Sequence, residues 1–334
     1  QIEKKLGRNL PLANLFQAPT IKELASLFNQ EDHSSEHQKS TTPLESATNL
    51  LNQSGSPLPR SSLIVIQPKG SKPPLFCIHV LGRGLKFYRP LAHHLGLEQP
   101  LYGLAAQIMD RKYAPPNRVE DLAAHYIKEM QILQPNGPYF LAGVSFGGSV
   151  AFEMAQQLVA QGQKVALLAL FDTYASEAVK KMPSGERFSA HWNNFLKLGP
   201  IFVLKKVKAK IQSFNDKLNH SLNEIGCKFY LGIGRPLPNN LQDFTFRKEN
   251  NQASRNYVPQ VYPGRVTLFR SRDHIIDVSS YRDPQLGWGE LAAGGLEFHE
   301  VPGTHLGMLQ EPHVQVLAEK LKDCLDKAQA ETHL

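Results

Sequence analysis

Ser145 stands in the segment Gly143-Val144-Ser145-Phe146-Gly147, whose Gly-x-Ser-x-Gly spacing is typical of a nucleophilic serine at a sharp turn. An apolar run of strand type, residues 139–142, precedes the segment, and a helical pattern over 148–161 follows it. The glycines let the backbone turn tightly, and the start of the helix places orphan N–H groups beside the serine oxygen. The pattern predicts that Ser145 is a nucleophile whose hydroxyl points into a cleft.

A serine hydroxyl is a poor nucleophile at neutral pH, so it needs a base within hydrogen-bond reach. His305 is the leading candidate among 13 histidines, because it lies in a Gly/Pro loop between the last strand-like run and the final helical pattern. Three other histidines compete with it. His299 falls inside a strand pattern, His313 falls at a helix start, and His79 is either a cleft residue or a buried strand residue.

The base in turn needs an acid to orient it, and in this context the acid comes between the serine and the histidine along the chain. Asp172 ends the apolar run 167–171, where a strand would leave the sheet. Asp273 follows the later run 265–269, and Asp277 lies close to it. Position alone does not separate these candidates.

Two backbone N–H groups are expected to stabilise the oxyanion that forms when the serine attacks a carbonyl. One is the N–H of Phe146, the residue after the nucleophile. The other should come from the glycine-containing loop 80–84, after the strand-like run 75–79, and Val80 is the natural donor.

The elements that must position these residues alternate between short apolar runs and amphipathic helical patterns. This alternation predicts an α/β fold: a mostly parallel sheet with helices on both faces and a functional crevice at the carboxyl ends of the strands. The runs are 63–66, 75–79, 101–104, 139–144, 165–171, 265–269 and 296–301, and the helical patterns are 87–95, 119–134, 148–161 and 313–327.

The interval from Tyr174 to about Asn250 interrupts the alternation, with basic amphipathic stretches and no good strand. An insertion of this length is usually functional, so we predict a helical lid, with a solvated helical decoration as the alternative. The interval has 13 Lys+Arg and 6 Asp+Glu, which accounts for the whole formal charge of +7. No aromatic-interleaved basic face accompanies the charge, which argues against nucleic-acid binding.

The composition bounds the class of protein. With 334 residues, 41% hydrophobic and 20% charged, the chain is expected to be soluble, with one large domain or two smaller ones. Neither a membrane-spanning run nor a signal peptide is evident, and the chain begins with Gln1, as expected of a piece of a longer protein. The three cysteines are far apart and lack metal-ligand spacing, so we expect buried free thiols, no metal and a reducing, cytoplasmic location.

Three zones differ in composition. Residues 1–30 have a helical pattern, in which Thr20 and Glu23 form a capping box. Residues 31–60 are rich in Ser, Thr, Gln, Asn and Pro and are typical of a flexible linker. Residues 61–330 form the large domain, with the lid insertion at about 174–250.

The motifs in the large domain, between about 63 and 324, resemble those of the chain-releasing thioesterase domain of modular nonribosomal peptide and polyketide synthases. The motifs are Val80-Leu81-Gly82-Arg83-Gly84, Gly143-Val144-Ser145-Phe146-Gly147-Gly148, Phe171-Asp172 and Gly303-Thr304-His305. The resemblance implies an α/β-hydrolase fold and a Ser145–His305–Asp172 triad without a bound metal or cofactor. It favours Asp172 over Asp273, because many members carry the acid at the end of the strand after the serine's helix. The loop 80–84 departs from the pattern of many family members at Val80 and Arg83.

Residues 1–30 are similar to the second half of a peptidyl or acyl carrier domain. The order carrier, linker, thioesterase is the usual end of a synthase assembly line. The resemblance implies that an acyl or peptidyl chain arrives as a thioester on the 4′-phosphopantetheine of a carrier, whose Gly-Ser attachment motif would lie before Gln1. Carriers resemble acidic helical bundles, so the basic lid is suited to steer a loaded carrier, with a membrane-surface role as a weaker alternative.

The expected reaction forms an acyl enzyme on Ser145, which water or a nucleophile of the same chain then resolves by hydrolysis or macrocyclisation. The sequence does not separate these two outcomes, and it reveals neither the acyl chain nor the oligomeric state. Two rival functions remain. One is a general carboxylester hydrolase or lipase on the same fold, against which the carrier-like zone argues, and the other is a docking domain that has lost its chemistry.

Overall fold

The computed structural model describes residues 62–82, 84–105, 118–175, 179–181, 200–273 and 280–332, which all fall in one compact unit. The predicted carrier segment 1–30 and the linker 31–60 lie outside the described residues, as do Arg83 and Asp277.

Seven strands of the described residues form one sheet in the order β1-β3-β2-β4-β5-β7-β9. The antiparallel edge strand β1 pairs with β3, and all other neighbours are parallel. This confirms the predicted mostly parallel sheet. The strands are β1 (Leu63–Gln67), β2 (Leu75–Ile78), β3 (Leu101–Leu104), β4 (Tyr139–Val144), β5 (Val165–Phe171), β7 (Val266–Ser271) and β9 (Leu296–Val301).

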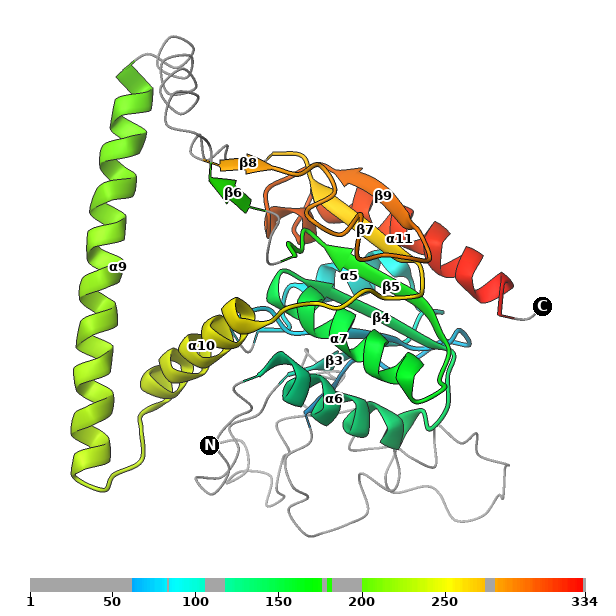
Figure 1. Ribbon diagram of the computed structural model, residues 1–334, viewed down its shortest axis with the longest axis horizontal. Helices are drawn as coiled ribbons and strands as arrows, with labels where there is room; N and C mark the ends of the chain where they lie inside the picture. Colours follow the sequence, from blue (N-terminus) through cyan, green and yellow to red (C-terminus); the bar gives the residue numbers. More distant parts are fainter. Residues whose placement is uncertain are drawn as a thin grey trace, which may run out of the picture. The chain divides into compact units, whose positions relative to one another are not determined.

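Helices cover both faces of the sheet, as Figure 1 shows. Helices α6 (Val119–Leu133) and α7 (Phe146–Ala160) pack on one face. On the other face, α5 (Tyr88–Leu95) and α11 (His313–Ala330) share one core with alternate residues of the strands. Burial on both sides explains why the central strands are continuous apolar runs rather than alternating ones.

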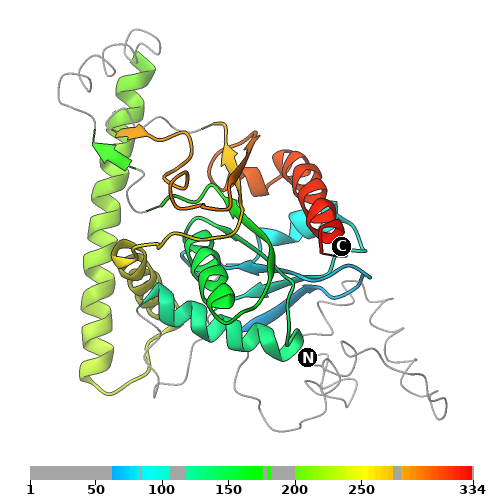
Figure 2. The ribbon, with the colours of Figure 1, turned by 45° about the vertical axis from the view of Figure 1, so that its right-hand side comes forward.

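In the described part of the insertion between β5 and β7, which the sequence predicts to be a lid, lie the helices α9 (Pro200–Gly232) and α10 (Asn239–Asn256). Helix α10 runs back beside α9 and also packs on α6 and α7, as Figure 2 shows. The expectation that this interval contains no strand was wrong, because β6 (Val179–Lys181) pairs with β8 (Ser280–Arg282) in a two-stranded sheet. Strands of three residues whose partners lie a hundred residues apart leave no periodic pattern in the sequence.

The cysteines are free in the structure, and Cys77 and Cys324 are buried as predicted. Cys227 is only half-buried, which corrects that prediction. It lies on α9, where its sulfur faces the hydroxyl of Thr245 on α10 rather than the core. Among the described residues, no helix combines the length and the apolar character needed to cross a membrane.

Gly147, at the start of α7, lets that helix approach β2 closely. A Cβ at this position would lie 2.5 Å from the backbone oxygen of His79 and 2.6 Å from that of Ile78. Both contacts are far inside van der Waals distance and involve backbone atoms, which cannot rotate away. The glycine is therefore required by packing as well as by the turn.

We expect Gly147→Ala to lower the free energy of unfolding by at least about 1–3 kcal/mol, because the added methyl group forces α7 away from the sheet. Gly232→Ala is the matched control, since no atom lies within 4 Å of a Cβ there. It should change stability by at most about 1 kcal/mol, in the stabilising direction. Urea unfolding followed by circular dichroism measures both, and equal stability of the two variants would contradict the close approach.

Candidate active site

Ser145 occupies a strained turn between β4 and α7. Its backbone has φ 55° and ψ −123°, a conformation that residues with a side chain rarely adopt. Its N–H donates to the carbonyl of Phe171 at 3.1 Å, and its carbonyl accepts from Gly148 N–H at 2.9 Å. Ser145 is partly exposed, whereas Val144 and Phe146 on either side are buried. The turn thus presents the serine at the carboxyl edge of the sheet.

Asp172 follows the last residue of β5 and also has a positive φ, 43°. It is fully buried, and its carboxylate is held from two sides. Oδ1 accepts from Ser271 N–H at 3.1 Å, while Oδ2 accepts from the Ser271 hydroxyl at 2.9 Å and lies 2.7 Å from His305 Nδ1. The structure therefore brings Asp172 and His305 together.

The pKa of Asp172 reflects two opposing effects. Burial is the largest single influence and raises it, whereas the hydrogen bonds from His305 and Ser271 and the attraction of the imidazole lower it. Together the lowering influences prevail, so the pKa of Asp172 falls below its ordinary value. Asp172 remains ionised at neutral pH and can stabilise an imidazolium at His305.

His305 lies in the loop that follows β9, and its side chain is 41% exposed. Asp273 anchors this loop instead of touching the imidazole. Its Oδ2 accepts from Gly303 N–H at 3.0 Å, and its own N–H donates to the carbonyl of Gly303 at 3.1 Å. The two acids that the sequence left open thus have different partners.

With Nδ1 directed at Asp172, the imidazole of His305 leaves Nε2 for a substrate or for the serine. No hydrogen bond joins the Ser145 hydroxyl to His305 in the part of the chain that the structure describes. Such bonds are commonly long or poorly aligned in enzymes without substrate and tighten once it binds. Of the competing histidines, His299 lies within β9 and His313 is the first residue of α11, as the sequence indicated.

His79 is fully buried, and its side chain is hydrogen-bonded to the loop that follows β2. Its Nδ1 lies 2.9 Å from the carbonyl of Gly82 and also contacts the carbonyl of Val80. Burial is the main influence on the pKa of His79 and lowers it, so the ring is neutral and donates from Nδ1. The ring also packs near Phe146 and Phe246, with centroids 5.8 Å and 5.5 Å away.

Asn250 of α10 is hydrogen-bonded to the same loop. It is 2% exposed and donates from Nδ2 to the carbonyl of Leu81 at 3.0 Å. Sequence reasoning missed this residue, because nothing in a polar helix distinguishes an asparagine that reaches another loop. The segment that carries Val80 is thus held by His79 and by Asn250 of α10.

Phe146, the other predicted oxyanion donor, is the first residue of α7. A backbone N–H in the first turn of a helix has no carbonyl of its own helix to donate to, so it is available to a ligand. The positive end of the helix dipole lies at the same point. Negative charge that develops beside Ser145 would be stabilised there.

The strand order, the sharp turn at Ser145 and the helices on both faces define an α/β-hydrolase fold. Solved structures share it. One is a holo four-domain nonribosomal peptide synthetase, with a TM-score of 0.58 and 22% sequence identity. The match covers 96% of this chain and 23% of the synthetase chain. The NocB thioesterase domain in a covalent complex with a fluorophosphonate nocardicin G analogue matches 79% of this chain with its full length, at 0.54 and 22%.

Within this fold class, a family model described as "Thioesterase domain" matches residues 73–325. The chain belongs to this family of hydrolases. Malpibaldin synthetase of Mortierella alpina is 28% identical over 328 residues, which cover 98% of this chain. The chain spans 5% of the length of that synthetase.

We expect Asp172→Asn to lower kcat for thioester cleavage on the order of 10³–10⁴-fold, because an amide cannot hold the tautomer of His305 that leaves Nε2 unprotonated. Asp273→Asn is the matched control, since its amide oxygen can still accept from Gly303 N–H. It should cost much less activity. Steady-state kinetics of both variants measure the difference, and equal losses would contradict the pairing of Asp172 with His305.

The pairing of Asp172 with His305 also affects how the free energy of unfolding depends on pH. Because folding lowers the pKa of Asp172, its ionised form stabilises the fold above the ordinary carboxyl pKa, and this contribution is lost as pH falls through the lowered value. Asp172→Asn does not titrate. Its unfolding free energy should therefore fall less between neutral and acid pH than that of the wild type.

Proposed function

We propose that this chain is a serine thioesterase that releases an acyl or peptidyl chain from the phosphopantetheine of a carrier domain through an acyl enzyme on Ser145. The observation that carries the proposal is the 2.7 Å pairing of His305 Nδ1 with the buried Asp172. This Asp172–His305 pair lies at the same carboxyl end of the strands as Ser145. The chain that carries it belongs to the thioesterase family.

In this mechanism, Ser145 Oγ attacks the thioester carbonyl while His305 Nε2 takes the hydroxyl proton. Asp172 stays ionised and stabilises the imidazolium, without itself accepting the proton. The carbonyl oxygen becomes an oxyanion that the N–H groups of Phe146 and Val80 stabilise. The C–S bond then breaks, His305 returns its proton to the leaving thiolate, and the acyl group remains on Ser145.

The acyl enzyme is resolved by a second attack, for which His305 removes a proton from the incoming nucleophile. Water gives a free acid, and a hydroxyl or amine of the acyl chain gives a macrocycle. Hydrolysis and macrocyclisation use the same three side chains, so the residues that line the space around Ser145 must decide which nucleophile attacks. Helix α10 packs against the loop that carries Val80, which supports a role for the lid in that choice.

The assignment of a carrier-bound substrate draws on the whole chain. The similarity to Malpibaldin synthetase covers 98% of this chain, more than the 73–325 match of the thioesterase family. The four-domain synthetase likewise matches 96%. Both matches support the proposal that residues 1–60 are a carrier remnant and a linker, and that an upstream synthase module delivers the substrate.

Intact-mass measurement with a small acyl thioester tests the proposal. We expect the wild type to gain the mass of one acyl group and Ser145→Ala to gain none, because only the serine oxygen can form the ester. Comparing turnover of the thioester with that of the matching oxygen ester separates a thioesterase from a general carboxylester hydrolase. An adduct that persists on Ser145→Ala, or faster turnover of the oxygen ester, would contradict the proposal.

A further inference from the structure

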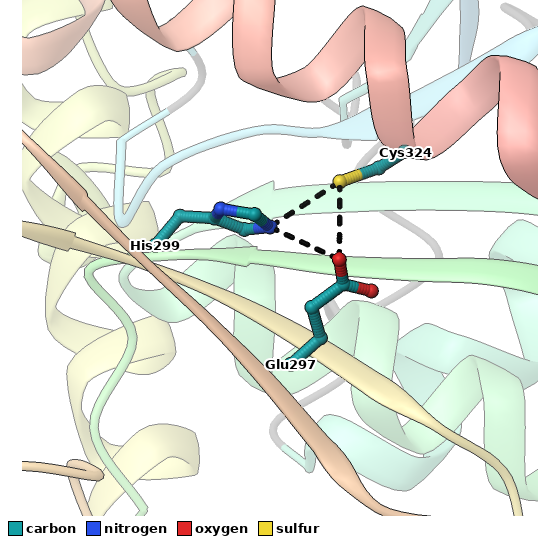
Figure 3. A group of neighbouring side chains, drawn as sticks. All are labelled: Glu297, His299 and Cys324. Carbon is teal, nitrogen blue, oxygen red and sulfur yellow. Dashed lines mark hydrogen bonds and ion pairs between the residues drawn. The ribbon is translucent and has the colours of Figure 1, made fainter.

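Three side chains that can ligate a metal ion converge between β9 and α11, away from the candidate active site (Figure 3). His299 Nε2 lies 3.3 Å from Glu297 Oε1 and 3.4 Å from Cys324 Sγ. The remaining separation, from Cys324 Sγ to Glu297 Oε1, is 4.0 Å. One potential ligand atom of each side chain thus lies within 4.0 Å of the other two.

The fold fixes this arrangement. Glu297 and His299 are two residues apart on the edge strand β9, so they project from the same face. Helix α11 packs on that face and supplies Cys324, which is 5% exposed. The ring of His299 stacks on Phe269 of β7, with centroids 5.0 Å apart, which holds the imidazole plane.

Without a metal, hydrogen bonds can join this cluster, but they meet at a single carboxylate oxygen. If His299 Nε2 carries a proton, it donates to Glu297 Oε1 at 3.3 Å, and the thiol of Cys324 donates to the same oxygen at 4.0 Å. If Nε2 is unprotonated, it accepts from the thiol, but its lone pair then faces the carboxylate oxygen at 3.3 Å. A cation at the centre would receive lone pairs from all three atoms at once.

The separations suit tetrahedral zinc. Zinc lies about 2.3 Å from sulfur, 2.0–2.1 Å from nitrogen and 2.0–2.2 Å from oxygen, so tetrahedral ligand atoms are roughly 3.3–3.6 Å apart. Two of the three observed separations fall in this range, and the third, between Cys324 Sγ and Glu297 Oε1, is longer at 4.0 Å. Thiolate, imidazole and carboxylate together favour zinc over magnesium or calcium, which prefer oxygen alone.

We propose that Glu297, His299 and Cys324 form a Zn²⁺ site with water as the fourth ligand. A cavity of about 310 Å³, whose lining includes Glu297 and Cys324, gives solvent and metal a way in. Lys327 lies 4.0 Å from Oε2 of Glu297 and leaves Oε1 to the metal. Binding replaces the S–H bond of Cys324 with a Zn–S bond and releases the proton to solvent.

The metal would be structural rather than catalytic. Glu297 and His299 lie within β9, whereas His305 lies in the loop beyond its carboxyl end, so the metal would be bound by side chains separate from the candidate triad. Zinc would tie the edge strand to the C-terminal helix α11. This proposal departs from the sequence-based expectation of no metal, because a Glu-x-His pair on a strand and a cysteine 25 residues later match no familiar metal-binding spacing.

Titration of the full chain with Zn²⁺ against a chromophoric chelator tests the site. We expect one tight equivalent in the wild type and affinities weakened on the order of 100-fold in Cys324→Ser and Glu297→Gln. Cys227→Ser and His94→Gln are the matched controls, and both should bind as the wild type does. Zn²⁺ should also raise the thermal unfolding midpoint of the wild type and of the controls, but not that of Cys324→Ser.

Co²⁺ reports the sulfur ligand directly. The wild type should show a thiolate-to-cobalt absorption band that Cys324→Ser lacks and Cys227→Ser keeps. Glu297 is partly exposed, so its variant still tests the site if Cys324→Ser fails to fold. Failure of the wild type to bind Zn²⁺, equal affinity in the ligand variants and the controls, or a cobalt complex without the sulfur band would each overturn the proposal.

Discussion

The hydrogen bond from Ser145 N–H to the carbonyl of Phe171 links the ends of two neighbouring parallel strands, and the proposed chemistry depends on that register. It places Ser145 and Asp172 one residue beyond β4 and β5. Both residues have a positive φ, which costs free energy that the packed sheet must offset. A slip of one residue in the pairing would turn every side chain of the strand to the opposite face and separate serine from acid.

Around this edge, each candidate functional group is held by a neighbour that takes no part in the reaction. Ser271 donates twice to Asp172 and offsets the cost of a buried carboxylate. Asp273 anchors the loop of His305, and His79 and Asn250 hold the loop of Val80. The site is thus preorganised by strand ends and loops that the sheet brings together, which is how electrostatic stabilisation acts without reorganisation during the reaction.

The sequence predicted well what depends on local pattern. All seven strands of the main sheet and the helices that cover it could be located, because apolar runs and amphipathic periods are local properties. It could not separate Asp172 from Asp273 without the family resemblance, since both follow strands and their partners depend on tertiary packing. The β6–β8 pair, the contact of Asn250 with the loop after β2, and the Glu297–His299–Cys324 cluster also join distant segments and have no local signature.

Labelling by a fluorophosphonate tests most directly whether Ser145, His305 and Asp172 act as one relay. Peptide mapping of the labelled chain should place the adduct on Ser145, and His305→Ala should label far more slowly because the serine then lacks its base. A label on another residue, or a rate unchanged by the loss of His305, would contradict the account.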